Sequence, residues 1–417
     1  MKNGIVVLCL VISAGFLPGA GQAAAQDQGP EGGISLMGQW KARPSLTVES
    51  TYSDNINLTA QNKTSDLVTY LSPALSVEHP LSDRGVASLG YGGDFAYYAE
   101  NSGNDWQSAQ IDFALDYAAP AGIIIGITDT FRATEDLNGA LNEYGEGERK
   151  KRWTNNFDGK IGYDFRNRLK IFGFISYDKQ DYNNDLIDWS QDYESKEYGV
   201  GWRLRIMPKT WAFARYFYGE TDYTTSSPAG ISGAPVNDSN DADLSWNRFN
   251  VGLTTDPTSK LRGELNFGYT WKTYDNEADK DGNPYDDKNT WIASTNIDYL
   301  MSPKTTVGIT IMRALWESSS GSNEFYESLE LGSKLRHKFF TKFTLNGAVS
   351  ARFNEYNTPS AGPKRSDDRY QVELGLDYQV NRWFSVGAKY NFIDRNSNFS
   401  ANSYSNNQIT LLLRGSI

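Results

Sequence analysis

Apolar and polar residues alternate along most of the chain beyond residue 43. The clearest stretch is YQVELGLDYQVNRWFSVGAKYNF, residues 370–392, in which every second residue from Tyr370 to Val380 is apolar and the residues between them are polar or small. The alternation restarts at Phe384 after a short polar break. Because successive side chains of a strand point to opposite faces, this pattern predicts a β-hairpin with one apolar and one polar face.

The same period of two recurs often enough to predict about 18 strands. Besides the hairpin, the apolar series are centred on residues 46–52, 71–77, 89–97, 111–117, 123–131, 157–165, 169–177, 198–206, 211–218, 249–253, 261–271, 297, 309, 331, 345 and 409–413. The series at 211–218 is aromatic on both faces, so the sequence leaves its orientation open. A period of two sustained over this length predicts strands rather than helices.

The connections between these strands alternate between short and long. The short ones are HPLSDR, APAG, RNR, MPK, DPTS, MSP, RHK and NR, while the long ones are polar, as at 221–243 and 275–287. Short periplasmic turns that alternate with longer external loops are the layout of an outer-membrane barrel. We therefore predict an all-β fold, a single transmembrane antiparallel β-barrel of about 18 strands over residues 43–417.

A soluble β-sandwich with an aromatic core is the alternative to a membrane barrel. Aromatic residues, among them Tyr97, Trp153, Trp202, Trp271 and Trp383, lie near the ends of the predicted strands, where a lipid–water interface would hold them. The unbroken series of hairpins shows no division into two sheets. In lipid every backbone polar group must pair internally, which a closed sheet achieves. These features favour the membrane barrel.

The first 25 residues have the features of a cleaved secretory signal peptide. Lys2 precedes an apolar run at 4–17, and Ala23 to Ala25 form a small-residue cleavage site. The run is too short to span a bilayer. The single cysteine, Cys9, lies inside this segment, so we expect no disulfide or thiolate site in the exported chain. Residues 26–42 are predicted to form a short periplasmic segment.

Composition narrows the class of function further. The chain carries 51 acidic and 40 basic residues, a net charge of −11, which makes nucleic acid an unsuitable partner. Only 39% of the residues are hydrophobic, which suits a barrel in which alternate residues face lipid. We expect integration into the outer membrane of a Gram-negative bacterium, with the lipid bilayer and the barrel-insertion machinery as partners.

Catalytic and metal-binding motifs are missing from the sequence. It contains two histidines, no G-x-S-x-G nucleophile motif and no phosphate-binding P-loop. The acidic stretch DNEADKDGNPYDD, residues 275–287, lacks the terminal glutamate and the glycine placement of an EF-hand loop. We therefore predict a protein without catalytic activity, cofactor or metal ion.

A barrel of 16 to 18 strands is wide enough to hold an aqueous channel. The charged residues on the polar face of the strands would then either line a hydrated pore or pair laterally into a mesh that closes the lumen. The predicted lumen residues are Lys160, Arg203, Arg205, Arg248, Arg262, Lys334, Arg352, Lys389, Asp112, Asp116, Asp158, Glu264, Glu373 and Asp377. Their signs nearly cancel, so they do not specify the charge of the cargo.

Aromatic residues also flank the external loops. Tyr182, Trp189, Tyr193 and Tyr223 lie next to segments rich in asparagine and aspartate. Aromatic faces together with amide and carboxylate groups can bind sugar rings. These four residues are candidate glycan contacts, and an ordinary set of interfacial aromatic residues is the alternative.

The segment RPSLTVESTYSDNINLT, residues 43–59, resembles the first strand and loop of a known family. Its core, Tyr52 to Ile56, resembles the Y-(D/S)-D-N-I opening of the β-barrel porins of exopolysaccharide operons, the EpsL-like and WzpX-like outer-membrane proteins. The hairpin segment TLNGAVSARFNEY, residues 344–356, extends the likeness.

The resemblance implies an 18-stranded conduit that passes a nascent polysaccharide to the cell surface, with export components of the periplasm or inner membrane as partners. A general or substrate-selective diffusion porin for small solutes, and a structural barrel with a blocked lumen, stay open as alternatives.

Overall fold

The computed structural model describes residues 33–36, 38–135, 151–182, 192–223, 242–256, 259–278, 284–317, 325–357 and 363–417. The predicted signal peptide lies outside these residues. Within the described part of the chain no helix is long and apolar enough to cross a membrane.

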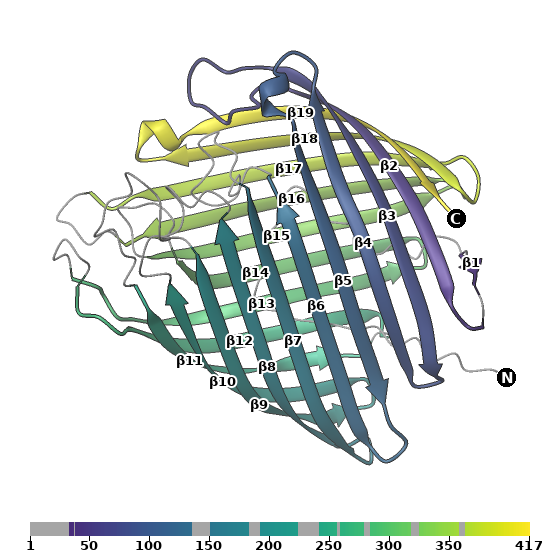
Figure 1. Cartoon of the computed structure of the whole chain (residues 1–417), viewed down its shortest axis with the longest axis vertical. Coiled ribbons are helices and arrows are strands. Elements are labelled where there is room, and N and C mark those ends of the chain that lie inside the picture. Colours follow the sequence, from purple (N-terminus) through teal and green to yellow (C-terminus); the bar gives the residue numbers. More distant parts are fainter. Residues whose placement is uncertain are drawn as a thin grey trace, which may run out of the picture.

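Eighteen strands of the described chain, β2 to β19, form one closed antiparallel barrel (Figure 1). Each strand pairs with the next along the chain, and β19 pairs with β2 to close the sheet. The strands are β2 (Lys41–Ser53), β3 (Asp66–Ser82), β4 (Gly85–Tyr98), β5 (Trp106–Ala118), β6 (Ile123–Thr134), β7 (Arg152–Phe165), β8 (Leu169–Tyr182), β9 (Tyr193–Met207), β10 (Thr210–Tyr223), β11 (Leu244–Thr255), β12 (Leu261–Tyr274), β13 (Lys288–Ser302), β14 (Thr305–Glu317), β15 (Phe325–Phe339), β16 (Phe343–Tyr356), β17 (Ser366–Gln379), β18 (Phe384–Ser397) and β19 (Tyr404–Ser416). The predicted barrel class and strand number are therefore confirmed.

A short additional strand, β1 (Ile34–Ser35), pairs with the start of β2 outside the barrel cycle. Trp40, between the two strands, stacks on His79 of β3 with 4.5 Å between ring centroids. β1 and the C-terminus lie at the end of the barrel that carries the short turns (Figure 1). Two 3₁₀ turns, η1 (Ser102–Asn104) and η3 (Ser400–Asn402), lie in the longer loops of the opposite end.

The predicted alternation of short and long connections is present, but some of the predicted turn segments lie in strands: His79 to Ser82 of HPLSDR belong to β3, and Met301 and Ser302 of MSP to β13. The short connections hold at most five residues, as at 256–260, whereas the longest loop runs from 224 to 243. The RHK segment, residues 336–338, which the sequence predicts as a short turn, lies inside β15. The turn follows at residues 340–342, where Phe340 has a φ of 53°, a left-handed conformation that reverses the chain.

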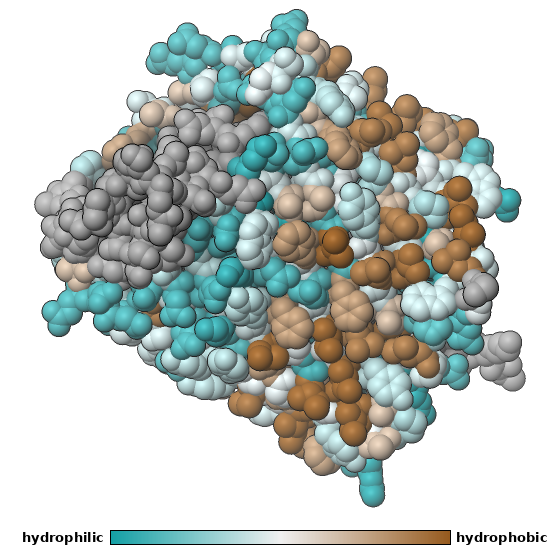
Figure 2. All heavy atoms as spheres, in the orientation of Figure 1, coloured by the Kyte–Doolittle hydropathy of each residue, from teal (hydrophilic) through white to brown (hydrophobic). Residues whose placement is uncertain are grey.

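The outer surface of the barrel is apolar toward the short-turn end. Figure 2 shows hydrophobic side chains gathered over that half of the visible face, with hydrophilic residues prevailing toward the loops. Among the exposed apolar side chains are Ile161, Val200 and Leu411, which are 62%, 61% and 63% exposed. The strands are longer than the roughly 9–11 residues that a tilted strand needs to cross lipid, so their loop-side ends extend beyond the apolar belt.

Candidate functional site

The inner face of the barrel consists of the residues that alternate with the exposed apolar ones. Along β17, β18, β19 and β2 this face is rich in amides and hydroxyls that bond across the strands. Thr51 bonds to Thr410 over 2.8 Å, and Ser53 donates to Asn406 over 2.9 Å. Three further bonds continue this polar wall and join Arg369 to Gln371, Gln371 to Asn391, and Asn391 to Gln408.

Ion pairs on the inner face reach over a glycine on the strand between the partners. Lys160 of β7 lies 3.1 Å from Asp116 of β5, and Gly126 of β6 is in register with both. Lys334 of β15 and Asp298 of β13 lie 2.9 Å apart and flank Gly308 of β14 in the same way. A Cβ atom at either glycine would lie 2.2 Å from the lysine Cε. Glycine therefore leaves room for each lysine to cross the intervening strand.

Two arginines form enclosed ion pairs on the inner face of β9 to β12. Arg215 of β10 donates two hydrogen bonds to Glu264 of β12, at 3.0 and 2.8 Å, and the two side chains are 9% and 3% exposed. Arg248 of β11 lies 2.7 Å from Glu197 of β9. These pairs, like those of the two lysines, join strands two apart, so they run along the wall and do not reach across the lumen.

The inner face of β4 to β8 carries acidic residues beside the basic side chains of Lys160 and Arg152. Asp94, Asp112, Asp158 and Asp178 accept hydrogen bonds there from uncharged donors. The donors are Ser72 and Ser108 for Asp94, Gln110 and Thr130 for Asp112, Ser176 for Asp158, and Asn156 for Asp178. Because uncharged donors leave the carboxylate charge in place, this wall presents negative charge to the lumen.

The remaining predicted lumen residues occupy different heights of the barrel. Arg262 donates to the carbonyl of Ser259 at the short-turn end and is exposed. Arg352 pairs with Glu330 on the neighbouring strand, and Asp377 accepts a hydrogen bond from Asn346 over 2.7 Å. Glu373 and Lys389 lie on the inner sides of β17 and β18, where they are in register with Asn391 and Gly375. Their placement is compatible with contact with water in the lumen.

The structure shows the orientation of β10, the strand whose aromatic residues the sequence left unassigned to a face. Tyr216 and Tyr218 are exposed on the outer face, while Trp211, Phe213 and Phe217 lie on the inner face. Guanidinium groups stack on these inner rings and on Phe172 of β8, at distances of 4.1 to 5.5 Å from the ring centroids. The pairs are Arg203 on Phe172, Arg205 on Trp211, Arg215 on Phe213 and Arg248 on Phe217.

Sequence reasoning did not assign these inner aromatic residues, although the chain carries a signal for them. Glycines lie in register with the bulky rings, as Gly199 does with Phe217 and Gly219 with Trp246. A Cβ atom at Gly199 would lie 2.3 Å from the ring of Phe217. A glycine in register with an aromatic residue of the neighbouring strand thus indicates that the ring lies over the glycine, on the face of the sheet that both residues share.

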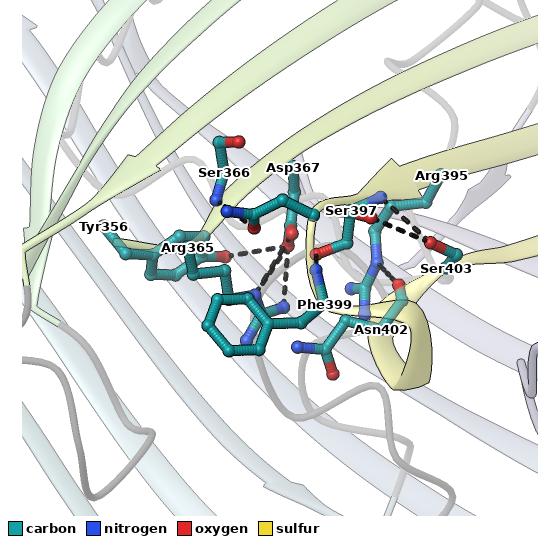
Figure 3. A network of polar contacts seen from close by, with 10 residues as sticks. Tyr356, Arg365, Ser366, Asp367, Arg395, Ser397, Phe399, Asn402 and Ser403 are labelled. Carbon is teal, nitrogen blue, oxygen red and sulfur yellow. Dashed lines mark hydrogen bonds and ion pairs between the residues drawn. The ribbon is translucent and has the colours of Figure 1, made fainter. Parts of the chain in front are cut away.

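Polar contacts tie together the loop-side ends of β16 to β19 (Figure 3). Arg365 bonds to Asp367 at 2.6 to 3.1 Å, and the hydroxyl of Tyr356 also donates to Asp367. Arg395 donates to the carbonyl of Asn402 over 2.5 Å. These bonds fasten the adjoining loops to the rim of the barrel.

The candidate glycan contacts lie at the same rim but differ in accessibility. Tyr182 is 1% exposed, so its ring face is covered in this structure. Tyr193 and Tyr223 are half-buried partners across β9 and β10, with ring centroids 6.0 Å apart. Trp189 lies outside the described residues. The half-buried pair is therefore the part of this set that solvent can reach.

The barrel wall opens between β13 and β14 toward the loop side, while β15 stays paired with β16 as far as Tyr326. β13 and β14 are paired only as far as Ala293 and Arg313, although both strands continue toward the loops, and β14 stays paired with β15 to its end. Arg313 donates hydrogen bonds across this gap to Thr290 and to the carbonyl of Trp291.

The loop-side end of the β14–β15 hairpin packs on the inside of β11 to β13 and remains attached to β16. Phe325 lies in one buried cluster with Leu244 and Tyr274, and its ring is 4.8 Å from the Lys272 ammonium, on the inner face of β12. Glu327 pairs with Lys288 over 2.5 Å and accepts a hydrogen bond from Thr290. Phe325 and Glu327 share a face with Leu331, which is exposed on the outside of the barrel. The hairpin end therefore folds over the mouth of the lumen, and we call it the infolded flap (residues 313–317 and 325–329).

Replacing Glu327 by lysine is expected to raise single-channel conductance in planar bilayers. The change places a third cation beside Lys288 and Arg313, so it opposes the closed position of the flap. A loss of about 1.4 kcal/mol shifts the ratio of closed to open flap about tenfold. Glu355→Lys is the matched control, because Glu355 is the exposed neighbour of Glu327 in register on β16. Equal conductance of the two variants would show that the flap does not limit flow.

Comparison with known proteins places the barrel in a family. Residues 30–416 match the family model described as putative beta-barrel porin 2. No curated protein matches the chain.

Similar solved structures include an outer membrane protein and a siderophore receptor. The outer membrane protein OpdK of Pseudomonas aeruginosa shares 12% identity over 90% of this chain and 99% of its own, with a TM-score of 0.46. OccAB4 of Acinetobacter baumannii shares 12% identity over 90% and 98%, with a TM-score of 0.47. The siderophore receptor PirA of Acinetobacter baumannii shares 8% identity over 90% and 80%, with a TM-score of 0.45. Since the family model spans nearly the whole closed barrel, the chain belongs to the putative beta-barrel porin 2 family of outer-membrane β-barrels.

Proposed function

We propose that the barrel is a passive conduit for an exopolysaccharide that leaves the cell through the outer membrane. The observation that carries this proposal is the polar wall of β17, β18, β19 and β2, where amides and hydroxyls bond in series. Such groups exchange hydrogen bonds readily with water and with sugar hydroxyls. A polymer can then slide along the wall without covalent chemistry, driven by its synthesis or by export components on the inner side.

A diffusion porin for small solutes is the second candidate function. The infolded flap favours it, because Phe325 and its neighbours cover part of the outer mouth. A narrow mouth passes small molecules more readily than a polymer. The two candidates share the aqueous lumen and differ in the size of the cargo.

Deletion of the gene, followed by assay of secreted and periplasmic polysaccharide, distinguishes the two functions. The conduit function is expected to give loss of surface polysaccharide and its accumulation in the periplasm, with restoration by the wild-type gene. Unchanged surface polysaccharide, together with slower uptake of small solutes, would favour the diffusion porin and overturn export.

A further inference from the structure

Four arginines occupy successive inner positions on one wall of the lumen. Arg205 and Arg203 follow each other on the inner face of β9, and Arg215 and Arg248 are placed at the next two levels by the register of β9, β10 and β11. Neighbouring levels are two residues apart along a strand, roughly 6.6 Å. We call this series the arginine ladder.

The aromatic rings hold the arginine ladder flat against the wall. Each of the four guanidinium groups lies over a ring of β8 or β10, with the closest approach 4.1 Å between Arg215 and Phe213. Stacking engages the face of a guanidinium group and leaves the N–H groups at its edge available for hydrogen bonds in the plane. The rings therefore orient the arginines and do not consume their donors.

Two members of the ladder form no ion pair within the described chain. Arg215 and Arg248 are paired with Glu264 and Glu197. Arg203 has no hydrogen-bond or ion-pair partner among the described residues, and Arg205 has only the side-chain oxygen of Asn167, at 2.9 Å. Both side chains are partly exposed on the inner face. Arg203 and Arg205 thus form a site of positive charge without an ion-pair partner that water can reach.

The distribution of charge around the lumen strengthens this site. The inner face of β4 to β8 carries aspartates whose hydrogen-bond donors are uncharged, such as Asp112 and Asp158. An anion in the lumen is repelled by that acidic wall and attracted by the ladder. The two walls together direct negative groups toward Arg203 and Arg205.

We propose that the arginine ladder binds the carboxylate groups of an acidic glycan as it passes through the barrel. The inference rests on the proposed function and specifies its cargo as a polymer that bears uronate or similar carboxylates. Guanidinium groups bind carboxylates through paired hydrogen bonds. Successive ladder positions then hand the carboxylates of the polymer from one arginine to the next.

The inference is tested by ion selectivity and block in planar bilayers. The wild-type protein is expected to favour anions over cations in a KCl gradient. Oligogalacturonate is expected to interrupt its current at lower concentration than a malto-oligosaccharide of equal length. Arg203→Gln combined with Arg205→Gln is expected to raise the blocking concentration of oligogalacturonate about tenfold, as loss of a charged hydrogen bond would. The blocking concentration of the malto-oligosaccharide is expected to stay unchanged in this double variant.

The matched control removes two positive charges from the far wall. Lys389→Gln combined with Arg414→Gln alters β18 and β19, which lie opposite β9 in the barrel cycle. This control is expected to keep the blocking concentration of oligogalacturonate near the wild-type value. An equal rise of the blocking concentration in both double variants would show that only the net charge of the lumen matters, and it would overturn the inference. The double variant Arg203→Lys with Arg205→Lys keeps both charges, and oligogalacturonate is expected to block it at a concentration between those of the wild type and the glutamine variant.

The remaining outcomes separate the inference from the function on which it rests. A wild-type channel that conducts but is blocked equally by both sugars, or blocked by inorganic phosphate as strongly as by oligogalacturonate, overturns the acidic-glycan inference and leaves a conduit. A wild-type barrel that inserts and carries no current overturns the conduit itself. Heat-dependent gel mobility of each variant shows that it has folded.

Discussion

Replacing Glu264 by glutamine is expected to lower the free energy of unfolding by about 3–5 kcal/mol, because it leaves the Arg215 charge without a counter-charge in an enclosed site. Glu264 is 2% exposed, and both of its carboxylate oxygens accept hydrogen bonds from the Arg215 guanidinium group. Water therefore cannot easily replace the lost partner. Equilibrium unfolding in urea with lipid vesicles measures the change.

A double variant separates the cost of an unpaired charge from the value of the pair. Arg215→Met combined with Glu264→Leu removes both charges and is expected to recover most of the stability, as replacement of a buried ion pair by apolar residues often does. Glu373→Gln is the control, because Glu373 lies partly exposed on the inner face. A cost below about 1 kcal/mol for Glu264→Gln would show that solvent reaches the pair and screens it.

The sequence predicts the barrel because the side chains of every strand that contact lipid must be apolar. That requirement is local, since it depends only on whether alternate residues are apolar, and it is visible in stretches such as 370–392. The RHK segment and most of the HPLSDR segment lie inside strands, because a polar strand end has the same composition as a turn. Composition distinguishes strand from turn less well than the period does.

The arrangement inside the lumen depends on contacts between strands and is harder to predict. The register places Lys160 and Asp116 on either side of Gly126, a relation that links residues 44 positions apart. The infolded flap depends on β13 and β14 separating beyond Ala293, and no residue pattern in either strand marks that point. Alternation predicts which face a residue occupies, and pairing decides which partner it meets.

The second large effect is expected when a charge is placed against lipid, within the apolar belt of the outer surface. Leu411→Arg is expected to destabilise the folded barrel by about 2–4 kcal/mol, the cost of arginine near the middle of a bilayer. Leu411 is suited to the test because it lies in the middle of β19, is 63% exposed and is in register with Ala388 and Ser50. The neighbouring outward positions Ile409 and Leu413 are also apolar and exposed, so no nearby acidic side chain on this strand can accept the charge.

The control for Leu411→Arg uses the opposite face of the same strand. Gln408 lies on the inner face and accepts a hydrogen bond from Asn391, so Gln408→Arg adds the same side chain where water can solvate it. Unfolding in urea from vesicles is expected to show a much smaller loss for Gln408→Arg, accompanied by a change in ion selectivity. If the two variants lost equal stability, lipid would not contact alternate residues of β19. The aqueous lumen, which both candidate functions require, would then lose its physical basis.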